Sequence, residues 1–142
     1  MDNEHKNMRQ CLIVEDHDEL RKSLREWLGE SLHDCEILEA ATGEAGVGLA
    51  QAHQPALVLM DINLPTMSGI EATRRIKHTL PGTHVVMLTI HEDAAFQMDA
   101  RAAGASAYVT KRKMHADLLP TLTRLLSPAP GGIGTRAKEQ LP

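Results

Sequence analysis

The sequence predicts an α/β fold in which five strand–helix units build a three-layer sandwich. Two observations carry this prediction: short apolar runs recur five times, and amphipathic stretches of helix length separate them. Such strict alternation favours a parallel sheet with helices on both faces, because right-handed crossovers leave few other topologies. The 142 residues, 42% of them apolar, are enough for one such domain.

The five expected strands are short, apolar and rich in branched side chains. They are "CLIV" (11–14), "CEILEA" (35–40), "ALVLM" (56–60), "HVVMLT" (84–89) and "AYVT" (107–110). We expect them in the flavodoxin-like order 2-1-3-4-5, in which the winding direction reverses between strands 1 and 3. Ligands of such sheets bind outside the carboxyl ends of the strands at that reversal, so the function is expected there.

Capping residues and helix breakers mark the expected helices. His17 or Asp18 precedes the first helix, Thr42 precedes the second, and Ser68 with Glu71 forms a capping box for the third. The expected stops are Pro55, the pair Pro81–Gly82, and Gly104. Pro120 interrupts the apolar pattern of the last helix; if that helix begins near Asp117, the proline falls in the first turn, where it is tolerated.

Composition excludes several classes of protein. The net charge of −4, with scattered Lys and Arg, gives no basic face for direct nucleic-acid binding. No apolar run is long enough for a membrane span, and the N-terminus has no apolar core of a secretory signal, so we expect a cytoplasmic protein. Cys11 and Cys35 lie in apolar runs and are interpreted as small buried side chains.

Polar residues end four of the five expected strands. Glu15 and Asp16 follow strand 1, Asp61 follows strand 3, Thr89 ends strand 4, and Lys111 follows strand 5. Three carboxylates at one sheet edge repel one another unless cations compensate them. A divalent ion together with the lysine would balance their charge, and oxygen ligands suit Mg²⁺, or Mn²⁺.

This set of side chains predicts a receptor for a transferring phosphoryl group. Asp61 would act as the nucleophile, while the metal and Lys111 neutralise the phosphoryl oxygens and Thr89 offers a hydroxyl. The product would be an aspartyl phosphate. Its added charge would draw Thr89 and Lys111 inward, and Tyr108 on the last strand is placed to move with them.

Four segments together resemble the receiver domain of two-component response regulators. They are "LIVEDHDELR", "LMDINLPTMSGIEATRRIK", "VVMLTIHED" and "GASAYVTK", and the resemblance runs from about residue 10 to residue 126. It implies that Glu15 and Asp16 are the acidic pair of a magnesium site, that Asp61 accepts the phosphoryl group, and that Asn63 binds the metal through its backbone carbonyl. It further implies that Thr89 and Tyr108 are switch residues and that Lys111 binds phosphate.

The resemblance also implies partners. A sensor histidine kinase would donate the phosphoryl group, and phosphorylation would strengthen homodimerisation through the fourth helix, fifth strand and fifth helix. Apart from Mg²⁺-dependent self-phosphorylation and slow autodephosphorylation, no enzymatic activity is expected. The phrase "LPGTHVVMLTIHED" resembles the branch that carries a LuxR-type helix-turn-helix output domain.

Two features depart from the family pattern. Ile90, followed by His91, stands where much of the family has a small residue, and this bulk would narrow access to Asp61 and change the lifetime of the phosphorylated state. Residues 127–142 are rich in Pro and Gly and are interpreted as a flexible linker or tail after a receiver domain over 10–126 and an extension over 1–9. A chain cut before a DNA-binding domain is favoured over a single-domain regulator that acts by docking.

Two other classes fit less well. A flavin-binding electron carrier shares the fold, but "EDHDEL" after strand 1 would repel a flavin phosphate. A phosphatase of the haloacid dehalogenase type also uses a nucleophilic aspartate with Mg²⁺, yet it carries a D-x-D pair on its first strand, whereas this chain has D-x-N after the third.

Overall fold

The computed structural model describes residues 8–127 and has one five-stranded parallel sheet. The strand order is β2-β1-β3-β4-β5, which confirms the predicted flavodoxin-like fold. The strands are β1 (Arg9–Val14), β2 (Cys35–Ala40), β3 (Leu57–Met60), β4 (His84–Thr89) and β5 (Ala107–Thr110). The predicted extension over residues 1–9 and the predicted tail over 127–142 lie almost wholly outside the described residues.

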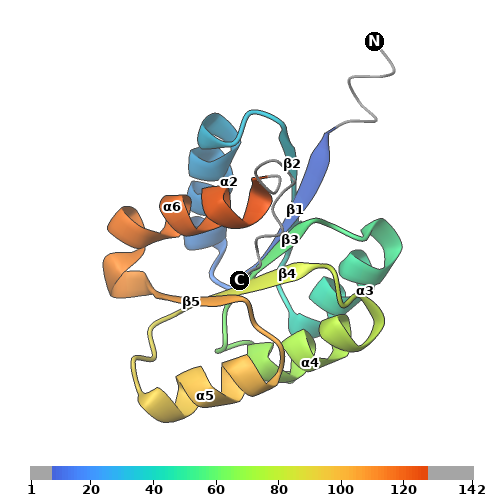
Figure 1. Ribbon diagram of the computed structural model, residues 1–142, viewed down its shortest axis with the longest axis vertical. Helices are drawn as coiled ribbons and strands as arrows, with labels where there is room; N and C mark the ends of the chain where they lie inside the picture. Colours follow the sequence, from blue (N-terminus) through green and yellow to red (C-terminus); the bar gives the residue numbers. More distant parts are fainter. Residues whose placement is uncertain (1–7, 128–142) are drawn as a thin grey trace, which may run out of the picture.

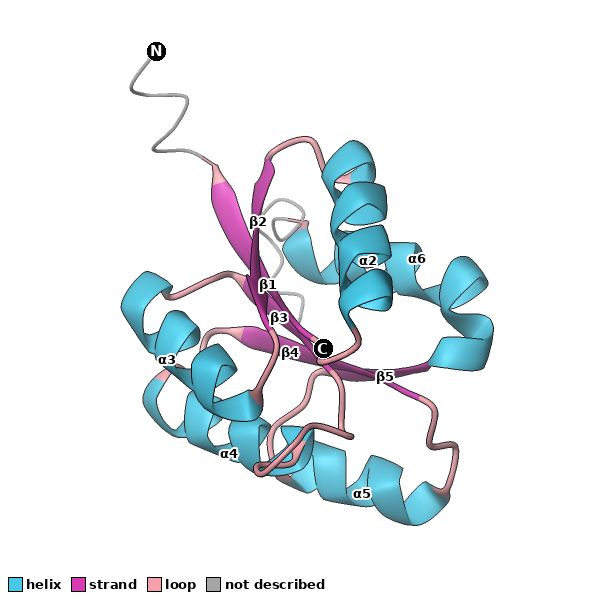
Figure 2. Ribbon diagram, turned by 180° about the vertical axis from the view of Figure 1, so that it is seen from behind, coloured by secondary structure: helices cyan, strands magenta, loops and turns pink. Residues whose placement is uncertain are grey.

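Five α-helices cover the two faces of the sheet (Figure 1). They are α2 (Asp18–Ser31), α3 (Gly43–His53), α4 (Gly69–Thr79), α5 (Ala94–Ala102) and α6 (Met114–Leu126). Figure 2 shows α2 and α6 on one face and α3, α4 and α5 on the other. Each face has its own apolar core, because side chains alternate along every strand: Ile13 and Leu59 belong to the first core, Val14 and Met60 to the second.

Side-chain caps begin the first three helices, as predicted. His17 Nδ1 accepts from the Leu20 N–H at 3.2 Å, and Thr42 Oγ1 accepts from the Ala45 N–H at 3.0 Å. Ser68 Oγ accepts from the Glu71 N–H at 3.2 Å, while the Glu71 carboxylate binds two arginines of α4. The reciprocal bond of a capping box, from the Ser68 N–H to the Glu71 carboxylate, is not found among the hydrogen bonds of the described residues.

Pro120 lies in the middle of α6, and the expectation that it falls in the first turn was wrong. A 3₁₀ turn over Lys111–Lys113 leads directly into the helix, which begins at Met114 rather than near Asp117. The proline is exposed, so the helix carbonyl that loses its usual N–H partner lies on the solvent side, where water can bind it. The fold tolerates the proline for this reason.

Both cysteines are free and buried in the core, as predicted. Among the described residues, no helix is both long and apolar enough to cross a membrane.

Candidate functional site

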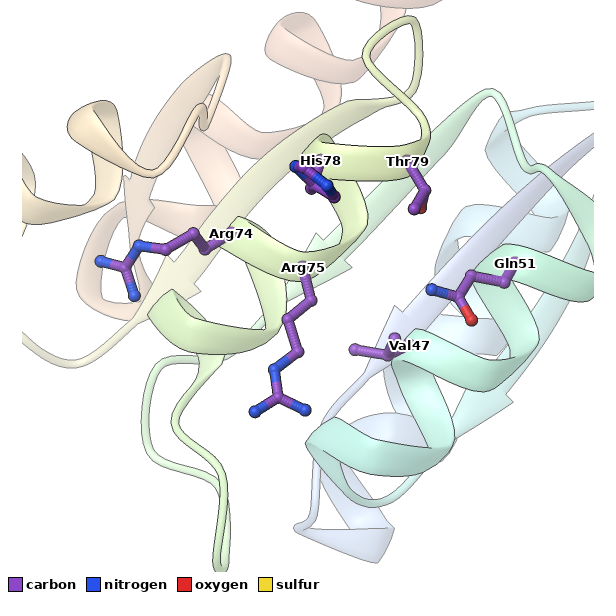
Figure 3. Close-up of a pocket in the computed structure, with 6 residues that line it drawn as sticks. All are labelled: Val47, Gln51, Arg74, Arg75, His78 and Thr79. Carbon is purple, nitrogen blue, oxygen red and sulfur yellow. The ribbon is translucent and has the colours of Figure 1, made fainter.

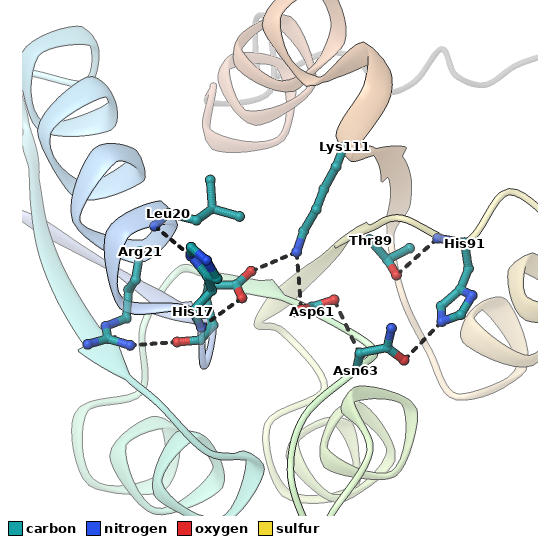
Figure 4. A network of polar contacts seen from close by, with 9 residues as sticks. His17, Leu20, Arg21, Asp61, Asn63, Thr89, His91 and Lys111 are labelled. Atoms are coloured by element: carbon teal, nitrogen blue, oxygen red, sulfur yellow. Dashed lines mark hydrogen bonds and ion pairs between the residues drawn. The ribbon is translucent and has the colours of Figure 1, made fainter.

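The polar residues at the strand ends meet at one edge of the sheet (Figure 4). Glu15 and Asp16 follow β1, Asp61 follows β3, Thr89 is the last residue of β4, and Lys111 follows β5. Parallel strands end on the same side of a sheet, and the reversal of winding between β1 and β3 brings the first two of these segments together. The topology therefore gathers residues that are up to 96 positions apart, from Glu15 to Lys111.

Three carboxylates form a cluster at this edge. Glu15, Asp16 and Asp61 each offer one oxygen, and these oxygens all lie within 4.8 Å of one another. Glu15 and Asp61 are buried, with 2% and 4% of their surface exposed, whereas Asp16 faces solvent. Burial and the nearby Asp61 charge raise the pKa of Glu15, although the His17 N–H and Lys111 act in the opposite direction.

Lys111 is the cation that faces the buried pair. Its Nζ lies 3.1 Å from Glu15 Oε1 and 3.2 Å from Asp61 Oδ2. Burial acts to lower the pKa of Lys111, but the Asp61 and Glu15 carboxylates outweigh it and raise the pKa above its ordinary value. One lysine balances only part of the charge of three carboxylates, so a divalent cation with hard oxygen ligands fits this cluster.

The loop after β3 approaches the start of α4 very closely. Asn63 N–H donates to Asp61 Oδ1 at 3.3 Å, and the Gly69 N–H donates to the Ile62 carbonyl at 2.9 Å. A Cβ at Gly69 would overlap the carbonyl oxygen of Asp61, so only glycine allows this approach. This contact explains the glycine of the "LPTMSG" segment in physical terms.

The hydroxyl and the aromatic residue predicted as switches lie on neighbouring strands. Thr89 is fully buried, and its Oγ1 accepts from the His91 N–H at 3.4 Å. The Tyr108 hydroxyl donates to the His91 carbonyl at 2.9 Å, while its ring packs against the core on the α4 and α5 face. Ile90 directly follows Thr89 in the sequence, and 63% of its surface is exposed to solvent.

Sequence reasoning missed two contacts of the site. Arg21 of α2 donates from Nη1 to the Glu15 carbonyl at 2.7 Å and also pairs with Asp18 and Glu39. The His91 ring contacts the Asn63 side chain at 2.9 Å. Both contacts cross between elements, and no helical or strand periodicity in the sequence signals them.

Three comparisons with known proteins agree with this geometry. Residues 11–123 match the family described as the response regulator receiver domain. The chain is 35% identical over 116 residues to the transcriptional activator protein ExaE of Pseudomonas putida, covering 82% of this chain and 54% of that protein. It is 34% identical over 119 residues to the chemotaxis protein CheY of Halobacterium salinarum, covering 84% and 98% respectively.

A solved structure has the same fold. The LuxR-family two-component response regulator from Aurantimonas sp. SI85-9A1 superposes with a TM-score of 0.78 at 32% identity, covering 84% of this chain and 85% of that chain. The chain spans about half the length of several curated relatives that it matches.

Fold, site and similarity define a signalling domain. This chain belongs to the family of response regulator receiver domains of two-component systems.

Proposed function

We propose that Asp61 accepts a phosphoryl group from the phosphohistidine of a sensor histidine kinase. The observation that carries the proposal is a nearly buried aspartate, 4% exposed, that has Lys111 at 3.2 Å and two further carboxylates beside it. A carboxylate oxygen of Asp61 would form the new bond to phosphorus as the bond between phosphorus and the donor's histidine nitrogen breaks. The negative charge on the phosphoryl oxygens needs fixed cations during this transfer, because the site is largely shielded from water.

Mg²⁺, or Mn²⁺, would supply the remaining positive charge and polarise the phosphoryl oxygens when bound. The residues that would hold it are Glu15, Asp16 and Asp61, with the backbone carbonyl of Asn63 as a further ligand. Lys111 would bind a phosphoryl oxygen while remaining protonated, which agrees with its raised pKa. Thr89 would donate its hydroxyl to another phosphoryl oxygen, and Tyr108 would follow the movement of Thr89.

We propose a transcriptional output for the whole protein. The support is indirect: several relatives are transcriptional regulators about twice as long as the matched segment, and a structural neighbour is of the LuxR family. In this proposal the domain spans residues 10–126, works in the cytoplasm, where kinases have access to ATP, and dimerises on phosphorylation through α5, β5 and α6. An unchanged sedimentation coefficient after phosphorylation would contradict the dimer.

A single-domain regulator that acts by docking is the second candidate. The alignment that covers 98% of the Halobacterium salinarum CheY favours it, because a receiver of this length is a whole protein there. Reading the coding sequence beyond Pro142 separates the two candidates directly.

The phosphoryl transfer is tested with acetyl phosphate as a small donor. With Mg²⁺ the protein should gain one phosphoryl group, seen as a mass increase, and chelation of the metal should abolish the gain. Asp61→Asn keeps the shape of the side chain and removes the nucleophile, so it should remain unlabelled. Labelling of this variant to the same extent would overturn the assignment of Asp61.

A further inference from the structure

His91, in the loop between β4 and α5, contacts four other parts of the site region. Its Nε2 lies 2.9 Å from the Asn63 side-chain oxygen, and its carbonyl accepts from the Tyr108 hydroxyl at 2.9 Å. Its N–H donates to Thr89 Oγ1, and its ring stacks on Phe96 with the ring centroids 4.1 Å apart. This single residue therefore connects the loop of the phosphoacceptor with both switch side chains and with α5.

The Asn63–His91 bond joins two loops that are separate in sequence (Figure 4). An amide oxygen only accepts, so His91 Nε2 carries the proton in this bond. On its other side, Asn63 donates its N–H to Asp61 Oδ1 at 3.3 Å. Three hydrogen bonds thus lie between Asp61 and Tyr108: the backbone N–H and the side chain of Asn63 make the first two, and the ring and the backbone carbonyl of His91 make the last two.

The two ends of the Asn63–His91 bond differ in how firmly they are held. Asn63 is exposed, whereas the His91 ring is partly buried and stacks on Phe96, a residue of α5 that packs against the core. A displacement of Asn63 would therefore be passed to a ring that is fixed to α5. Because the ring stacks on Phe96, a displacement of the ring would act on α5 and on the β4–α5 loop, where the His91 carbonyl accepts from the Tyr108 hydroxyl.

We infer that His91 is a positioning residue that couples the state of Asp61 to Tyr108 through the Asn63 side chain, in addition to the movement of Thr89. The inference rests on the proposed phosphorylation of Asp61. A phosphoryl group brings nearly two negative charges to the oxygens that the Asn63 N–H contacts, so this loop must readjust. The His91 ring then carries the change to the β4–α5 loop and to the hydroxyl of Tyr108.

The chain offers a direct probe of this coupling, because Tyr108 is its one tyrosine. Incorporation of 3-fluorotyrosine places a single fluorine nucleus at Tyr108, and its NMR resonance reports the environment of the ring. Spectra are recorded with Mg²⁺ before and after acetyl phosphate, and the intact mass of the same sample gives the extent of phosphorylation. Chemistry at Asp61 and the response of Tyr108 are then measured separately.

We expect His91→Ala to be phosphorylated as fully as the wild type, while the change in the fluorine resonance falls by about half or more, as for loss of a coupling of the usual size. The backbone carbonyl remains in this variant, so only the ring is tested. His91→Gln keeps an N–H donor within reach of Asn63 and should recover most of the response. His84→Ala is the matched control: it removes the histidine at the start of β4, whose ring bonds Ser106 at 3.0 Å, and it should respond as the wild type does.

Two results would overturn the inference. A full resonance change in phosphorylated His91→Ala would show that the ring carries no coupling. Loss of phosphorylation in His91→Ala would show that the residue acts on the chemistry itself. Absence of phosphorylation in the wild type is distinct from both, because it would overturn the proposed function.

Discussion

Glu15 is the side chain whose surroundings conflict most with its charge. It is 2% exposed and lies in the same cluster as Asp61, and its carboxylate pairs with Lys111. Burial and the Asp61 charge raise its pKa, so the folded state holds this proton more tightly than the unfolded chain does. The site therefore costs stability in the absence of a metal.

Glu15→Gln should stabilise the metal-free protein by about 1 kcal/mol at about pH 7, because it removes a buried charge and leaves Lys111 paired with Asp61. A carboxyl whose pKa is raised by folding contributes most to stability at pH values below its ordinary pKa of 4.5. That contribution is lost as the pH rises through the pKa of the folded state. The advantage of the variant should therefore shrink as the pH falls toward about 5. Urea unfolding with a chelator present measures it, and a variant less stable than the wild type at both pH values would contradict this account.

Two glycines of helix α3 differ in how closely neighbouring residues pack against them. A Cβ at Gly46 would lie 2.8 Å from Val14 Cγ2, on the residue that precedes Glu15, whereas nothing lies within 4 Å of a Cβ at Gly48. Both are interior to the same helix, so they share the same backbone entropy cost.

Gly48→Ala should raise the free energy of unfolding by about 0.5–1 kcal/mol, since alanine is the better helix former. Gly46→Ala should lower it by about 1–3 kcal/mol, because the new methyl group pushes α3 away from β1. Thermal unfolding of the two variants side by side measures the difference. Equal effects of the two substitutions would show that α3 has room for a methyl group at Gly46 next to β1.

The elements of this fold were predictable because each strand is an apolar run bounded by polar or turn residues. The observed strands differ from the predicted ones by at most two residues, at the start of β1. The start of α6 was expected near Asp117, whereas a 3₁₀ turn over Lys111–Lys113 already leads into the helix at Met114. Helix-turn geometry of this kind has no clear periodic signal.

The candidate site was partly predictable for a different reason. Topology alone brings the ends of parallel strands together, so the positions of Asp61 and Lys111 follow from their places after β3 and β5. The contacts of Arg21 with the Glu15 carbonyl and of His91 with Asn63 depend on how far side chains reach across loops. These side-chain contacts depend on how the loops pack against one another, and the pattern of residues in a single sequence does not specify that packing.

For the whole molecule, the acidic cluster predicts a link between metal binding and stability. Mg²⁺ would bind the folded state and not the unfolded chain, so the melting temperature should rise with its concentration; at about 100 times the Kd the gain is about 2.7 kcal/mol. Asp16→Asn removes the exposed carboxylate of the cluster and should abolish most of this rise with little change in metal-free stability. Thermal melts over a Mg²⁺ titration measure it, and an equal rise in the variant would place the metal elsewhere.

The most direct test of the account locates the phosphoryl group itself. Borohydride reduces an aspartyl phosphate to homoserine, which peptide mass mapping identifies at a single position. After treatment with Mg²⁺ and acetyl phosphate, homoserine should appear at position 61 and at no other aspartate. Homoserine at Asp16, or at no position although the protein has gained a phosphoryl group, would contradict the assignment of Asp61 as the acceptor.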